Sequence, residues 1–69
     1  MALSARNRLS GTVKSLDTQG LMAEVVVETD GGQEITAVIT SSSAERLGLA
    51  EGEEVDAVVK ATEVMIENA

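Results

Sequence analysis

The sequence predicts a single all-β domain over residues 1–69, a small five-stranded barrel of the oligonucleotide-binding type with one short helix, assembled as an oligomer. Apolar residues recur at every second position over most of the chain, which is typical of half-buried strands. One serine-rich stretch ending in glycine interrupts this pattern and predicts the helix. The composition leaves too little material for a large core, which favours the oligomer.

The central hairpin is the clearest local feature. Within 21–28 one face carries Leu21, Ala23, Val25 and Val27, and the other carries Met22, Glu24, Val26 and Glu28. The turn signal 30–32 follows, and 34–40 alternates again. Because both faces of 21–28 hold apolar residues, we expect one face to meet another subunit.

The flanking segments complete the predicted barrel. Residues 9–16 are rich in β-branched side chains and predict an earlier strand, with its turn at 17–20. Residues 55–60 and 63–66 predict one long or two short final strands. Between them, Ser42 and Glu45 fit a capping box, and Gly48 fits the position just past a helix end.

Composition restricts how so short a chain can be stabilised. A domain of about 60 residues buries only about 60% of the surface that its unfolded chain exposes. The 69 residues include no Cys, His, Phe, Tyr or Trp, so disulfides, soft metal ligands and aromatic core residues are excluded. We therefore expect oligomerisation to supply the missing burial.

Charge and hydropathy restrict the partners. The net charge of −7 and the lack of aromatic stacking residues disfavour nucleic acid. No apolar run approaches the length of a membrane span, and residues 1–9 do not resemble a signal peptide. We expect a cytoplasmic protein with neither a membrane nor a nucleic-acid partner.

Catalytic and metal-binding residues are scarce. Without His or Cys, the common nucleophile–base pairs cannot be built, so no enzyme activity is predicted. Four carboxylates could hold a hard cation, but they lack calcium-loop spacing and are better interpreted as a solvated turn and strand start: Glu51, Glu53, Glu54 and Asp56.

Three segments carry the hydrogen-bond donors that an anion needs: 4–7, 40–43 and 60–62. Residues 40–43 precede the predicted helix, where free amides and the helix dipole attract negative charge. Each segment also has a structural interpretation: a frayed terminus, a helix N-cap with surplus hydroxyls, and a lysine extending into solvent. Residue types alone leave these alternatives open.

Sequence motifs favour the anion site. The segments Ser-Ala-Arg-Asn-Arg-Leu-Ser-Gly at 4–11, Ala-Glu-Val-Val-Val-Glu at 23–28 and Val-Lys-Ala-Thr-Glu-Val-Met-Ile at 59–66, with glycines at 31, 32 and 48, resemble the molbindins. Molbindins, or Mop proteins, are molybdate-binding domains related to the transport-associated oligobinding (TOBE) domains. The resemblance extends from residue 4 to residue 66.

This resemblance implies a hexamer, a trimer of dimers, that binds molybdate or tungstate between subunits. One subunit contributes a hydroxyl, main-chain amides and positive charge through Ser4, Ala5, Arg6, Lys60 and Ala61. A neighbouring subunit contributes the hydroxyls of Thr40 and Ser43. Molybdenum is held only as the oxyanion, with no protein atom bonded to the metal and no other cofactor.

Two positions depart from the family pattern. Some relatives have Ser at the position of Ala61, so this chain loses one possible hydroxyl donor. Many relatives have Gln where this chain has Arg8, whose side chain either adds positive charge near the site or faces solvent. The resemblance thus implies a site whose donor set differs slightly from that of other members.

The implied function is storage, buffering or delivery of molybdate in the cytoplasm. Two alternatives belong to other classes. The first is a barrel that mediates protein interactions and whose anion sites stay empty. The second is an oligonucleotide-binding barrel, suggested by fold analogy alone, which the acidity and the absence of aromatic residues oppose.

Overall fold

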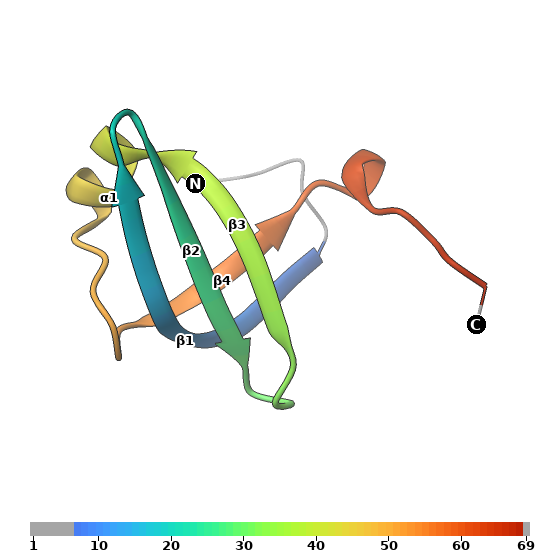
Figure 1. The fold of residues 1–69 in the computed structure, drawn as a ribbon. Coiled ribbons are helices and arrows are strands. Elements are labelled where there is room, and N and C mark those ends of the chain that lie inside the picture. The colour runs from blue at the N-terminus through green and yellow to red at the C-terminus, as the bar shows by residue number, and fades with distance from the viewer. Residues whose placement is uncertain (1–6, 69) are drawn as a thin grey trace.

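The computed structural model describes residues 7–68 as a strongly curled antiparallel sheet with one α-helix and one 3-10 helix (Figure 1). The elements follow the order β1 (Asn7–Gln19), β2 (Met22–Thr29), β3 (Glu34–Thr40), α1 (Ser41–Leu47), β4 (Glu54–Val59) and η1 (Ala61–Glu63). The order of strands in the sheet is β3-β2-β1-β4.

The long strand β1 produces the curl. Its first half pairs with β4, from Asn7 opposite Val59 to Thr12 opposite Glu54. Its second half pairs with β2, and the register shifts between Val13 and Ser15. Such a bulge bends a strand and increases its twist. The bend turns β4 across the inner face of the sheet, so that β3 and β4 become the two edges of a groove (Figure 1).

The core lies on the concave side and is small. Among residues 7–68, the buried apolar side chains are Val13, Ala23, Val25, Val27 and Ala44. The chain exposes 5504 Å², whereas a compact monomer of 7.1 kDa would expose about 4,100 Å². The single chain therefore carries about a third more surface than a compact domain of its mass.

The predicted hairpin is confirmed, with two differences at its start. Ala23, Val25 and Val27 are buried on one face of β2, and β3 pairs with β2 along its whole length. Leu21 does not join that face: it lies in the turn and is 86% exposed. Residues 17–19 extend β1 instead of forming the turn, because they continue the ladder with β2 up to Gln19 opposite Met22.

The last part of the chain differs from the prediction. Residues 55–60 correspond to β4, but 63–66 form no strand; η1 and an extended segment take their place. Within residues 7–68 the sheet therefore has four strands rather than five, and the groove between β3 and β4 leaves it unclosed. The physical reason is that the chain runs away from the sheet after η1, so 63–66 pairs with neither of the edge strands β3 and β4 (Figure 1).

Gly11 tests the account of the curl. A Cβ at this position would lie 2.4 Å from the carbonyl oxygen of Glu28 and 2.9 Å from a methyl of Val27, so Gly11→Ala must push β1 and β2 apart. We expect a loss of about 1–3 kcal/mol in the free energy of unfolding, measured by urea denaturation followed by circular dichroism. Gly31→Ala is the control, since its nearest such contact is at 3.9 Å; equal stability of the two variants would contradict the account.

Candidate functional site

Thr40 connects β3 to α1 and caps the helix. Its backbone is extended (φ −73°, ψ 149°), and its Oγ1 accepts a hydrogen bond from the amide of Ser43 at 3.1 Å. The predicted capping box is wrong, because the helix starts earlier than Ser42 and Glu45 would require. A capping box needs Glu or Gln three residues after the cap. Three residues after Thr40 stands Ser43, which has a hydroxyl instead of a carboxylate.

The start of α1 is anchored to the β1–β2 turn. The amide and the hydroxyl of Ser41 donate to the carbonyl oxygens of Leu21 and Gly20, each at 2.8 Å. The other end is closed by Gly48 in the left-handed region (φ 65°), as predicted, and Ala44 is the helix residue that packs into the core. The serine run, residues 41–43, is therefore fixed by the β1–β2 turn, by the core contact of Ala44 and by the closed end of the helix.

The hydroxyls of the serine run form a directional chain. Thr40 Oγ1 donates to Ser43 Oγ at 2.7 Å, and Ser42 Oγ lies 3.3 Å from Thr40 Oγ1. Because the single proton of Thr40 goes to Ser43, Ser42 is the donor in the second bond. Ser43 Oγ also accepts from Arg46 Nη2 at 3.2 Å. Its oxygen thus accepts two hydrogen bonds, and its own proton is left for an external acceptor.

Arg46 is a residue that the sequence prediction missed. Its signal was present in the spacing, since residues three apart on a helix are neighbours and Arg46 follows Ser43 at that distance. The guanidinium adds positive charge beside the hydroxyl chain and strengthens the polarisation of Ser43. With seven residues, α1 aligns few peptide dipoles, so these side chains provide most of the attraction for an anion.

Lys60 and Ala61 lie at the end of β4. Lys60 caps η1 with an extended backbone, its carbonyl oxygen accepts from the amide of Glu63 at 2.8 Å, and its side chain is exposed. Asn7 pairs with Val59, so the start of β1 lies beside Lys60 and Ala61, which we call the η1 corner. The predicted site residues Ser4, Ala5 and Arg6 lie outside the described residues.

Two groups of predicted site residues form in separate places. The structure brings Thr40 together with Ser43, and Lys60 next to Ala61. Figure 1 shows α1 and η1 at opposite sides of the sheet, so the two groups do not meet within one chain. Each group alone offers too few donors to surround a tetrahedral anion.

Lys60 differs from Arg8 and Lys14 in its partners. Arg8 pairs with Asp56 at 3.2 Å, which satisfies the side chain that departs from the family pattern. Lys14 pairs with Glu34, and the hydrogen bond and negative charge of Glu34 raise the pKa of Lys14 above 10.5. Within residues 7–68, Lys60 makes no salt bridge. No described carboxylate therefore neutralises its ammonium group.

The carboxylates that might have held a cation do not converge. Among the described residues, no group of three or more Asp or Glu side chains is placed to bind a metal ion. The same part of the chain includes no helix with the length and apolar character needed to cross a membrane. The donor groups described above remain the best candidate for a site.

Comparison with known proteins identifies the family of this chain. The chain belongs to the TOBE domain family, whose model matches residues 3–66. Within that family it is a member of the Mop group. It is 52% identical to molybdenum-pterin-binding protein 2 and 50% identical to molybdenum-pterin-binding protein 1, both from Clostridium pasteurianum, over 96% of this chain and 97% of each relative.

Solved structures show the same fold. MopII from Clostridium pasteurianum matches with a TM-score of 0.91 at 49% identity, over 97% of this chain and 100% of that chain. A molybdate-binding protein from Sporomusa ovata matches with a TM-score of 0.93 at 40% identity, over 99% and 100%. The cytoplasmic molybdate-binding protein ModG, solved with molybdate bound, matches with a TM-score of 0.84 at 46% identity, over 88% of this chain and 43% of its own.

The cap at Thr40 predicts a stability effect. Thr40→Ala removes the acceptor for the Ser43 amide and the donor to the Ser43 hydroxyl, so it should lower the free energy of unfolding by about 1 kcal/mol. Thr40→Ser keeps both bonds and should stay within a few tenths of a kcal/mol of the parent. Urea denaturation at one fixed protein concentration measures both, and an equal loss in the two variants would show that the hydroxyl is unimportant.

Proposed function

We propose that this protein binds molybdate, and tungstate with it, as a non-catalytic homo-oligomer that stores, buffers or delivers the anion in the cytoplasm. The close relatives named for molybdenum-pterin or molybdate binding support the choice of ligand. The proposed assembly is a hexamer, a trimer of dimers. The anion itself is the bound species, and no protein atom is bonded to molybdenum.

The proposed site lies between subunits. The observation that carries this proposal is the pair of incomplete donor groups in residues 7–68: the Ser43 hydroxyl, whose oxygen accepts two hydrogen bonds, and the Lys60 ammonium, which makes no salt bridge within that range. A second subunit can bring the α1 group against the η1 corner. The full donor set then comprises Ser4, Ala5, Arg6, Lys60 and Ala61 from one subunit and Thr40 and Ser43 from its neighbour.

The donor set suits an anion without protons. Molybdate at neutral pH is a tetrahedral dianion whose oxygens only accept hydrogen bonds. Phosphate keeps a proton at this pH, and a site built from donors would leave that proton unsatisfied, at a cost of about 1–3 kcal/mol. Sulfate carries no proton but is smaller, so its rejection depends on cavity size, whereas tungstate has nearly the size of molybdate.

The acidic surface does not prevent binding. The net charge of −7 repels a dianion at long range, but salt screens this field beyond about 8 Å under physiological conditions. Hydrogen bonds from charged donors are about twice as strong as neutral ones and act at contact distance. Local donors therefore determine affinity, and the surface charge mainly slows association.

Titration calorimetry tests the ligand. Anion-free protein should give saturable heat with molybdate and tungstate, and much weaker binding with sulfate and phosphate. At a molybdate concentration of about one hundred times Kd, the melting temperature should rise by at least about 10 °C. Absence of heat with every oxyanion, together with an unshifted melting curve, would contradict the proposal and favour the protein-interaction barrel.

A matched pair of lysine variants tests the site. Lys60→Met should weaken molybdate binding by about ten- to a hundredfold, because it removes a charged hydrogen bond of about 1.5–3 kcal/mol. Lys14→Met makes the same change in net charge, but Lys14 is engaged with Glu34 and should leave affinity nearly unchanged. Equal weakening in both variants would mean that overall charge, rather than the η1 corner, determines binding.

A further inference from the structure

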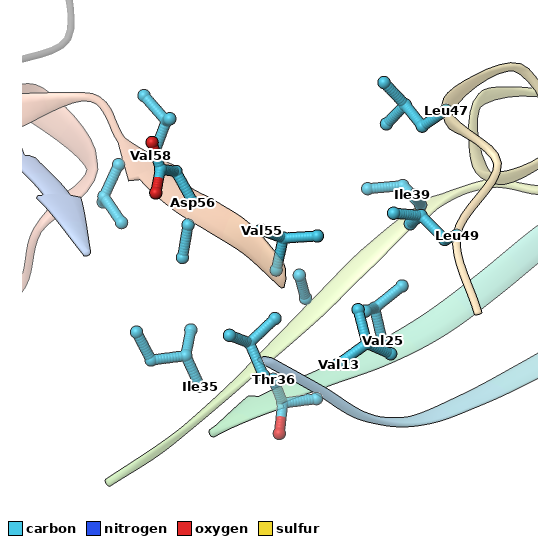
Figure 2. A pocket seen from close by; sticks show the side chains of 14 residues that line it. Val13, Val25, Ile35, Thr36, Ile39, Leu47, Leu49, Val55, Asp56 and Val58 are labelled. Atoms are coloured by element: carbon cyan, nitrogen blue, oxygen red, sulfur yellow. The ribbon is translucent and has the colours of Figure 1, made fainter. Parts of the chain in front are cut away.

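The exposed face of β4 carries a carboxylate and leads to Lys60. Exposed and half-buried residues alternate along β4, and Asp56 and Val58 take exposed positions. Figure 2 shows both residues on the β4 side of the groove between β3 and β4. Lys60 continues the row, because its backbone is still extended (φ −65°, ψ 135°) and its side chain is exposed. Asp56, Val58 and Lys60 therefore follow one another on one face, since alternate residues of a strand point the same way.

Arg8 lies opposite the middle of this row. It pairs with Val58 in the ladder between β1 and β4. In an antiparallel pair, a side chain also has diagonal neighbours two residues before and after its partner, about 7–8 Å away, which a long side chain can reach. The diagonal neighbours of Arg8 are Asp56 and Lys60. One guanidinium is therefore flanked by a carboxylate on one side and an ammonium group on the other.

The Arg8 side chain takes the diagonal toward Asp56. Its Nη1 donates to Oδ2 of Asp56 at 3.2 Å, and the hydroxyl of Ser10 donates to Oδ1 of the same carboxylate at 3.1 Å. The opposite diagonal would bring two positive groups together, which is unfavourable unless a negative charge lies between them. Asp56 therefore holds the guanidinium on the side away from Lys60.

A bound oxyanion would offer Arg8 a second partner. Lys60 belongs to the η1 corner, and an anion beside its ammonium group would lie on the other diagonal of Arg8. A guanidinium can donate two parallel hydrogen bonds to such an anion. The anion must compete with Asp56 for this guanidinium, and the Arg8–Asp56 pair is exposed, with 54% and 40% of the two side chains accessible. Because exposed ion pairs are weak, this pair can open while the strands stay paired.

We propose that Arg8 is a further anion-binding residue of the η1 corner and that Asp56 is its resting counter-ion, which lowers the affinity of this corner for an oxyanion. Arg8 exchanges Asp56 for the anion when the site fills. Asp56 acts through Arg8 and hardly on the anion itself, because it lies four strand residues, or about 13 Å, from Lys60, and salt screens charges beyond about 8 Å. This inference rests on the proposed function and concerns the residues that set its affinity.

A double-mutant cycle, read by titration calorimetry with molybdate, tests the exchange. Asp56→Asn removes the carboxylate charge but keeps an oxygen that can accept from Ser10, so the fold should be retained, which circular dichroism checks. We expect Asp56→Asn to raise the affinity about fivefold, which is the strength of an exposed ion pair. Arg8→Gln should weaken binding about threefold in the parent and about tenfold in the Asp56→Asn background, where Arg8 has no competing partner.

Glu34→Gln is the matched control. It removes the same charge from a second exposed ion pair, that of Lys14 with Glu34 on β3, and the affinity should stay within about twofold of the parent. The variant with both Asp56→Asn and Arg8→Gln should likewise bind within about twofold of Arg8→Gln alone. An equal gain from Glu34→Gln and Asp56→Asn would overturn the proposal, because net charge would then explain both. So would a gain from Asp56→Asn that persists without Arg8.

Nuclear magnetic resonance of the parent protein provides an independent measurement. The Nε–H signal of Arg8, identified by its absence from the spectrum of Arg8→Gln, should move when molybdate saturates the protein. A fixed Arg8 signal, with the amide signals of Lys60 and Ala61 displaced, would overturn this proposal while supporting the proposed function. A parent protein that gives no heat with molybdate would instead overturn the proposed function and this inference together.

Discussion

The small aliphatic core is the constraint on which the rest of this structure depends. Among residues 7–68, five apolar side chains are buried, two of them alanines. At about 25 cal/mol per Å², so little buried area cannot offset the conformational entropy of some 60 ordered residues by a wide margin. Covering more of its apolar surface would stabilise the protein, and the groove between β3 and β4 and the exposed residues Val64, Met65 and Ile66 mark where that surface lies.

The bend in β1 links this constraint to the candidate site. The bulge after Val13 and the close approach of Gly11 to Glu28 let one strand belong to both halves of the sheet. The same bend separates the α1 corner from the η1 corner. A chain folded in this way presents two partial donor groups to its surroundings, and in the function we propose a second chain completes each of them.

Local features could be predicted from the sequence, and long-range ones less well. Alternation placed Val25 and Val27 inside, and glycine at 48 marked the helix end. Leu21 was misplaced because period-two patterning continues through the turn, and the capping box failed because Thr40 caps at an earlier position. The sequence indicates Thr40 and Ser43 as anion-binding candidates but not Arg46. The hydrogen bond from Arg46 to Ser43 depends on where the helix actually starts. The strand expected at 63–66 has strand-like residues, but a strand also needs a pairing partner, and this segment runs away from the edge strands β3 and β4.

The most direct test of this account is a crystal structure of the full-length protein grown with molybdate. The account predicts an anion held between two chains, with Ser43 of one chain and Lys60 of another both within hydrogen-bond distance of its oxygens. An anion bound entirely by residues of one chain would contradict it. So would an assembled protein with molybdate located far from both residues.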